Sequence, residues 1–171
     1  MKYQEIYGDL IELTKQGKFN VIAHGCNCFC TMGAGIAVPM KEAFGCDHFN
    51  LEDNHFQGDI NKLGQIDFRN ILYNTKTTRL LMGYSLPKPD YIVEFFVVNA
   101  YTQYHWDRNT KPFDYDAFTL CMRKMNHTFK GMHIGLPQIG SHLAGGDWEL
   151  IKVIIQKELK DCEVTIVIFK K

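Results

Sequence analysis

Three short segments of this chain are almost wholly apolar, and they constrain the fold more than any other feature of the sequence. They are Val21-Ile22-Ala23, Phe95-Phe96-Val97-Val98 and Val164-Thr165-Ile166-Val167-Ile168. A strand with one solvated face alternates apolar and polar residues, whereas these segments are typical of central strands that helices cover on both faces. With other β-rich segments, they predict strands at residues 3–7, 19–23, 64–73, 91–98, 132–136 and 163–169.

Amphipathic segments between these strands supply the helices. Residues 114–129 place apolar side chains at three- and four-residue spacing, with Asp114 in the first turn. Residues 147–160 repeat the pattern, with Asp147 at the capping position, and a third helix is expected at about residues 35–44. Alternating strands and helices predict an α/β fold, a three-layer α/β/α sandwich.

Length and charge limit the range of partners. The chain has 171 residues, which predicts a single domain over residues 1–171. Its 19 Lys and Arg balance its 19 Asp and Glu, and a protein that grips a long nucleic acid normally carries a basic excess. The start of the chain has no apolar signal core, and no apolar run approaches the roughly 18 residues that span a bilayer. We therefore expect a cytoplasmic monomer with no membrane or extended nucleic-acid partner.

The six cysteines include a cluster at Cys26, Cys28 and Cys30. Zinc loops usually leave about two to four residues between the first two cysteines, and this cluster leaves one. We therefore expect reduced cysteines that serve as small packing residues, with no metal and no cofactor.

Two glycine-rich loops, at residues 24–37 and 135–148, each follow an apolar strand and lead into a helix. Glycines let the backbone approach a ligand closely, and the N–H groups at a helix start point toward an anion. The first loop matches neither the P-loop nor the full dinucleotide-binding pattern. An ordinary turn would also fit either loop alone, but two such loops at one edge of a sheet suit a diphosphate.

Three ordered segments together resemble the macrodomain family, which binds ADP-ribose. They are Gly8-Asp9-Leu10, Ala23-His24-Gly25-Cys26-Asn27 with Met32-Gly33-Ala34-Gly35-Ile36-Ala37, and Leu136-Pro137-Gln138-Ile139-Gly140-Ser141-His142-Leu143-Ala144-Gly145-Gly146-Asp147-Trp148. The resemblance runs from about residue 3 to residue 169. It is strongest to the branch with the terminal ADP-ribose-protein hydrolase, the DNA de-ADP-ribosylating antitoxins and the ADP-ribose-1''-phosphate phosphatases. It implies a mixed sheet and an ADP-ribose derivative as the small-molecule partner.

The resemblance also implies residue roles. Asp9, beside Leu10, matches the residue that accepts a hydrogen bond from the adenine amino group, and Asn27 matches the asparagine at the distal ribose. Phe169 is a candidate ring for stacking on adenine. By themselves, Asp9 is also typical of a turn and Phe169 of a core residue. The two diphosphate loops match Gly33, Ala34, Gly35, Ile36 and Ala37, and then Gly140, Ser141, His142, Leu143 and Ala144.

Two positions depart from the hydrolases and antitoxins of this branch. Gln103 stands where their catalytic lysine would be, and Ala144 stands where the protein hydrolase has an aspartate. An amide can neither form a Schiff base nor supply a cation, so lysine-dependent chemistry is not expected.

Three histidines remain near the expected distal ribose: His24, His105 and His142. Imidazole titrates near neutral pH and can move the protons that hydrolysis of a 1''-phosphate requires. With Asn27 orienting the ribose and a water, these residues predict a metal-independent ADP-ribose-1''-phosphate phosphatase. Three alternatives stay open: an ADP-ribosyl hydrolase acting on protein or on nucleic-acid ends, a reader that binds ADP-ribose without chemistry, and, for each histidine, a plain surface or packing role.

Overall fold

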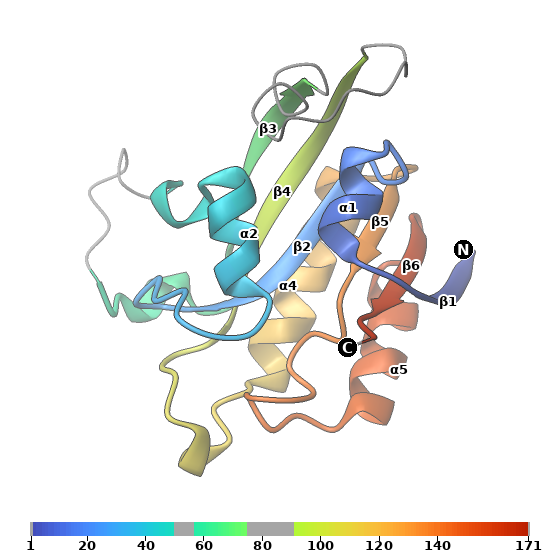
Figure 1. The fold of residues 1–171 in the computed structure, drawn as a ribbon. Helices are drawn as coiled ribbons and strands as arrows, with labels where there is room; N and C mark the ends of the chain where they lie inside the picture. Colours follow the sequence, from blue (N-terminus) through green and yellow to red (C-terminus); the bar gives the residue numbers. More distant parts are fainter. Residues whose placement is uncertain (1, 50–56, 75–90, 171) are drawn as a thin grey trace.

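The fold centres on one six-stranded sheet, seen in a computed structural model that describes residues 2–49, 57–74 and 91–170 (Figure 1). The strand order is β1-β6-β5-β2-β4-β3, in which β3 runs antiparallel to β4 and the other neighbours are parallel. The sheet is therefore mixed. The strands are β1 (Tyr3–Tyr7), β2 (Val21–Asn27), β3 (Ile66–Asn74), β4 (Ile92–Gln103), β5 (His133–Leu136) and β6 (Glu163–Ile168).

Helices cover both faces of this sheet. The helices α1 (Leu10–Lys15) and α2 (Ala37–Phe44) lie on one face, and α4 (Tyr115–Thr128) and α5 (Trp148–Glu158) lie on the other (Figure 1). Short 3₁₀ helices occur at η1 (Cys46–His48), η2 (Ile60–Lys62) and η3 (Arg108–Thr110). The expected three-layer α/β/α sandwich is confirmed.

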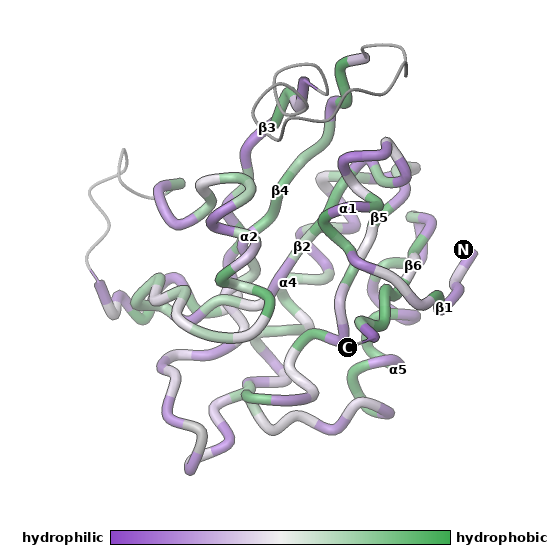
Figure 2. Tube along the Cα trace, viewed as in Figure 1, coloured by the Kyte–Doolittle hydropathy of each residue, from purple (hydrophilic) through white to green (hydrophobic). Residues whose placement is uncertain are grey.

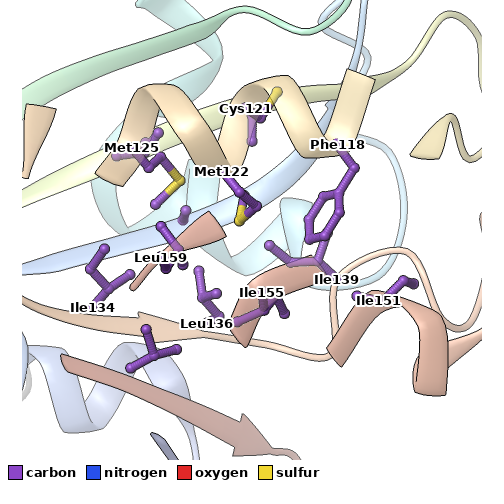
Figure 3. Packing of buried hydrophobic residues seen from close by; sticks show 14 of the residues in the cluster. Phe118, Cys121, Met122, Met125, Ile134, Leu136, Ile139, Ile151, Ile155 and Leu159 are labelled. Carbon is purple, nitrogen blue, oxygen red and sulfur yellow. The ribbon is translucent and has the colours of Figure 1, made fainter. Parts of the chain in front are cut away.

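The two layers of helices create two hydrophobic cores, which explains why the central strands do not alternate. Along β2, Val21 and Ala23 pack in the core under α4 and α5, whereas Ile22 packs in the core under α1 and α2. Figure 3 shows the first core, in which side chains of α4, β5 and α5 point toward one another, among them Met122 and Leu136. Both faces of the strand therefore bury apolar surface.

Hydropathy follows the same layers. Figure 2 shows hydrophobic residues along the central strands, and hydrophilic ones prevail on the loops that leave the sheet at its lower end. Among the described residues, no helix combines the length and apolar character needed to cross a membrane.

The predicted elements are all present, but several bounds differ. The strands expected at 19–23 and 91–98 are β2 and β4, which continue to Asn27 and Gln103. Both predicted strands end just before a polar residue, His24 in β2 and Asn99 in β4. In the structure these two residues pair with each other inside the sheet, with His24 Nε2 2.8 Å from Asn99 Oδ1. A buried pair of this kind satisfies both polar groups without interrupting a strand.

Helix boundaries depend on local capping. Asp114 and Asp147 cap α4 and α5 as predicted, with side chains that accept hydrogen bonds from Ala117 N and Glu149 N. The helix expected from residue 35 begins at Ala37. The helix α1 was not predicted, because its six residues are too short for a periodic apolar pattern.

The packing of α4 and α5 against the sheet can be tested by truncating a side chain buried in the core beneath these two helices. Ile155 of α5 is fully buried, so Ile155→Ala should lower the free energy of unfolding by about 2–5 kcal/mol. Val153 of the same helix is 60% exposed, and Val153→Ala should change it by less than about 0.5 kcal/mol. Urea unfolding monitored by circular dichroism measures both. Equal losses from the two variants would contradict the packing of α5.

Candidate functional site

Three strand ends and two glycine-rich loops meet at one edge of the sheet. The strands β2, β4 and β5 are parallel, so their carboxyl ends lie together, at the bottom of Figure 1. Asn27 at the end of β2 is the register partner of Gln103 at the end of β4. A Cβ atom placed on Gly35 would lie 3.4 Å from Leu143 Cδ1, which puts the first loop against the second. The structure thus brings the two predicted diphosphate loops into contact.

The first loop is shaped by Asn27. Its Oδ1 atom accepts hydrogen bonds from Phe29 N at 3.0 Å and Thr31 N at 3.2 Å, and its Nδ2 atom donates to Thr31 O at 3.1 Å. Only 6% of Asn27 is exposed. The amide predicted to orient the distal ribose therefore first organises the turn that leads from β2 into the loop.

The loop ends at a helix N-terminus that no side chain caps. Ile36 is the N-cap residue of α2, and its side chain makes no capping hydrogen bond. The N–H groups of Ala37 and Val38 have no partner within the helix, because first-turn N–H groups never do. Gly35 has a φ of +60°, a conformation that glycine adopts without strain, and Gly33 and Ala34 are exposed. Backbone donors and the helix dipole therefore favour an anion at this point.

The second loop requires glycine at position 140 for two reasons. Gly140 has a φ of +75°, and a Cβ atom there would lie 2.2 Å from the ring of Phe113. Gly146 N donates to Gly140 O at 2.8 Å and closes the loop upon itself. Ala144 is buried, and its carbonyl accepts a hydrogen bond from Phe113 N. The loop is therefore held in one shape from beneath by Phe113.

His142 lies exposed on this loop with one ring nitrogen engaged. The Ser141 hydroxyl donates its proton to Gln138 O at 2.9 Å, and Ser141 Oγ lies 3.0 Å from His142 Nδ1. Because the single hydroxyl proton of Ser141 is already donated to Gln138 O, His142 Nδ1–H must donate to Ser141 Oγ. In the neutral ring, Nε2 then carries the lone pair, which is the form that a general base requires.

His105 and Gln103 form a small turn after β4. Gln103 Nε2 donates to His105 O at 2.7 Å, and His105 Nδ1 accepts a hydrogen bond from Asp107 N at 3.0 Å. The Gln103 amide thus has a structural partner within this turn. His105 remains partly exposed at the end of the sheet where the loops meet.

His24 occupies a different environment. Its side chain is fully buried on the α1 and α2 face, with Cys46 Sγ 3.5 Å from Nε2 and Cys26 Sγ 3.7 Å from the same atom. Burial lowers the pKa of His24 from 6.5 to about 4, and the hydrogen bond to Asn99 opposes this shift. The structure separates His24 from solvent, and this environment suits a neutral packing residue better than the predicted acid or base.

The predicted adenine end lies at the carboxyl ends of β1 and β6. These strands pair in parallel, and Gly8 N donates to Ile168 O at 3.0 Å, so Asp9 and Phe169 follow neighbouring strand ends. Phe169 is 66% exposed, whereas Leu10 is buried in the core. Asp9 caps α1, with Oδ1 accepting from Ile11 N and Glu12 N. The turn role and a ligand role are compatible, because a carboxylate has two oxygens.

Sequence patterns did not single out three further groups near the loops. Thr102 Oγ1 is buried without a hydrogen-bond partner among the described residues, 3.0 Å from where a Cβ of Gly25 would lie. Phe29 makes edge-to-face contacts with Tyr104 and Trp106. Lys62 is buried beside Cys30. In the sequence, only the close spacing of the aromatic residues Tyr104 and Trp106 gave a signal, and nothing marked Thr102 or Lys62.

The cysteine cluster lies within residues 24–37, at the end of β2 and the start of the first loop. Cys26 and Cys28 are buried, and Cys30 is partly exposed. Across residues 2–49, 57–74 and 91–170, no three His, Cys, Asp or Glu side chains are grouped so that they could hold a metal ion.

Solved macrodomains have the same fold. The macrodomain of Thermus aquaticus DarG has a TM-score of 0.61 and 20% identity, covering 99% of this chain and 98% of its own. Thermosipho africanus DarTG in complex with ADP-ribose has a TM-score of 0.65 and 15% identity, covering 98% of this chain and 42% of that longer one. A protein of unknown function from Bacteroides thetaiotaomicron also has a TM-score of 0.65, at 22% identity over 98% of both chains. This chain therefore has the macrodomain fold.

A viral relative fixes the family more narrowly. The chain is 31% identical over 169 residues to an uncharacterized 17.5 kDa protein from the tk-vs intergenic region of Enterobacteria phage T4, covering 95% of this chain and 93% of the phage protein. It belongs to the same protein family as that phage protein. No protein-family model matches the sequence.

The buried His24 predicts a pH dependence of stability. In the unfolded chain His24 binds a proton below about pH 6.5, whereas in the folded chain it does so only below about 4. Unfolding therefore takes up a proton between these values, so the free energy of unfolding should fall by up to about 3 kcal/mol as the pH drops through this window.

The matched variants are His24→Gln, which keeps a donor near the Nε2 position, and His127→Gln on the exposed part of α4. Urea unfolding between pH 4 and 7 should show a shallower pH dependence for His24→Gln and an unchanged one for His127→Gln. The same slope in both variants would rule out His24 as the source.

Proposed function

We propose that this chain binds ADP-ribose through its two glycine-rich loops. The observation that carries the proposal is their contact, with Gly35 of the first loop against Leu143 of the second, beside the uncapped N-terminus of α2. Backbone N–H groups that converge from two loops suit the two phosphates of a diphosphate. Thermosipho africanus DarTG in complex with ADP-ribose gives this ligand a precedent on the same fold.

The proposed orientation follows the strand order. Adenine lies at the ends of β1 and β6, where Phe169 offers an exposed ring and Asp9 a carboxylate. The distal ribose lies at the ends of β2 and β4, next to Asn27 and Gln103. The diphosphate between them spans the two loops. Thr102, buried next to Gln103, has a hydroxyl that a water or ligand at this end would satisfy.

We further propose that the chain hydrolyses ADP-ribose-1''-phosphate to ADP-ribose and inorganic phosphate. A water attacks the phosphorus, the bond between phosphorus and the 1'' oxygen breaks, and that oxygen leaves with a proton. His142 supports this reaction, because Ser141 engages its Nδ1–H and leaves Nε2 to exchange protons. Loop N–H donors would stabilise the growing charge on phosphate.

A hydrolase that removes ADP-ribose from a nucleic-acid end is a second candidate. The observation that favours it is an aromatic cluster in which the Phe29 ring contacts two others edge to face, with centroid distances of 5.4 Å to Tyr104 and 5.2 Å to Trp106. Trp106 is 55% exposed, and exposed rings of this kind stack on unpaired bases. Gln103 and Ala144 lack the groups that relatives use, so this reaction would rely on attack by water.

Two glycines with the same backbone conformation test the binding mode. Gly35 and Gly45 have φ values of +60° and +62° and flank α2 at its two ends, so alanine at either should cost similar backbone strain. Gly35→Ala should weaken ADP-ribose binding roughly tenfold, as the loop relaxes from its shape, and Gly45→Ala should leave it unchanged. Isothermal titration calorimetry measures both. If the wild-type protein fails to bind ADP-ribose, the proposed function is wrong.

Turnover distinguishes the proposed activities. The protein is incubated with ADP-ribose-1''-phosphate, ADP-ribosylated single-stranded DNA and ADP-ribosylated protein, and released phosphate and ADP-ribose are measured. We expect phosphate release, reduced about 10²–10⁴-fold by His142→Ala and unchanged by His127→Ala. Full activity of His142→Ala would refute the role of this histidine. ADP-ribose binding without turnover of any substrate would make the chain a reader.

A further inference from the structure

A cluster of four polar side chains lies behind the first glycine-rich loop. Lys62 Nζ donates to Cys30 Sγ at 3.5 Å, and Cys30 Sγ lies 3.6 Å from the hydroxyl of Tyr101. Tyr101 in turn donates a hydrogen bond to the carboxylate of Asp67. The cluster connects η2, the first loop and the strands β3 and β4. None of these four residues has a part in the proposed hydrolysis.

The ammonium of Lys62 is the unusual member. Only 6% of Lys62 is exposed, and among the described residues no carboxylate lies within 4 Å of its Nζ atom. Its neighbours are the Cys30 sulfur and the ring of Tyr101, whose centroid is 5.7 Å away. Burying an ammonium without a counter-charge is costly, and a thiolate at Cys30 would supply that charge.

We propose that Cys30 is a nucleophilic thiol whose thiolate pairs with the Lys62 ammonium, and that it is a modification site for hydrogen peroxide and similar small soft electrophiles. Its partly exposed side chain gives such a reagent access. The thiol first loses its proton to solvent. The sulfur then attacks one peroxide oxygen, the O–O bond breaks, and the leaving hydroxide takes up a proton to form water. Cysteine is oxidised to sulfenic acid, and peroxide is reduced.

The remaining cysteines are poor competitors for this reaction. Burial raises the pKa of Cys28 to about 11 and the pKa values of Cys46 and Cys121 to about 12. It also raises those of Cys26 and Cys162. Thiols that stay protonated at neutral pH react slowly, because the thiolate is the nucleophile. Selectivity for Cys30 is therefore expected.

Modification of Cys30 should also reach the glycine-rich loop. Cys30 has a φ of +57°, a strained value for a residue with a side chain, and its N–H group donates to Asn27 O at 3.0 Å. An added oxygen on Sγ would push against Lys62 and Tyr101 and disturb the turn that Asn27 organises. Weaker ADP-ribose binding after oxidation would follow, and this last step rests on the proposed function.

The test measures alkylation of each cysteine by iodoacetamide at pH 7, using mass spectrometry of the intact, folded protein. Cys30 should be alkylated at least about tenfold faster than any other cysteine, and Lys62→Met should slow it about tenfold. The control Lys130→Met removes an exposed charge at the far end of α4 and should have no effect. Circular dichroism and thermal unfolding confirm that each variant is folded.

Each outcome bears on the proposal. Slow alkylation of the wild-type Cys30, or faster alkylation of Cys28, would overturn it even if Lys62→Met did not fold. An equal Cys30 rate in folded Lys62→Met would overturn the ion pair. Treatment with hydrogen peroxide should weaken ADP-ribose binding in the wild type and spare Cys30→Ser. If the untreated protein binds no ADP-ribose, the proposed function fails, and the alkylation rates still decide the nature of Cys30.

Discussion

The parallel pairing of β2 with β4 is the constraint on which the rest of this structure depends. Nearly all of β2 and residues 97–102 of β4 are buried on both faces, so these segments must bury side chains in two directions and satisfy every backbone group within the sheet. Parallel pairing also brings their carboxyl ends to one edge. Asn27 and Gln103 become neighbours for this reason, although 75 residues separate the two strands at the His24 and Asn99 pair. The site is a consequence of strand direction.

Loop shape is the second requirement, and it depends on what lies beneath each loop. Phe113 leaves no room for a side chain at Gly140, and the amide of Asn27 fixes the turn before Gly33. Such loops lose little further entropy when a ligand arrives, because their conformation is already set. Residues with no ligand contact, such as the buried Phe113 beneath Gly140, can therefore control affinity through the shape of the loop.

The sequence predicted the layers, the central strands and the meeting of the loops, because periodicity and capping are local properties. Packing partners are not local. The pattern grouped His24 with His105 and His142, yet His24 is enclosed by Asn99, Cys26 and Cys46, which lie on three different segments of the chain. The burial of Lys62 could not be predicted for the same reason, because a lysine in a polar segment is expected to be solvated and only the fold encloses it. Burial, which sets protonation and reactivity, is a property of the whole fold.

The charge of the chain shows how the difference between local sequence patterns and the whole fold affects the assignment of a ligand. A formal net charge of zero argues against a long polyanion but not against a diphosphate, because backbone N–H groups and the start of α2 offer positive potential without adding to the formal count. The Lys62 ammonium adds to the count, yet in this structure it faces a thiol and an aromatic ring instead of the exposed glycines of the loop. The distribution of potential around the loops therefore depends more on backbone direction than on the number of lysines and arginines.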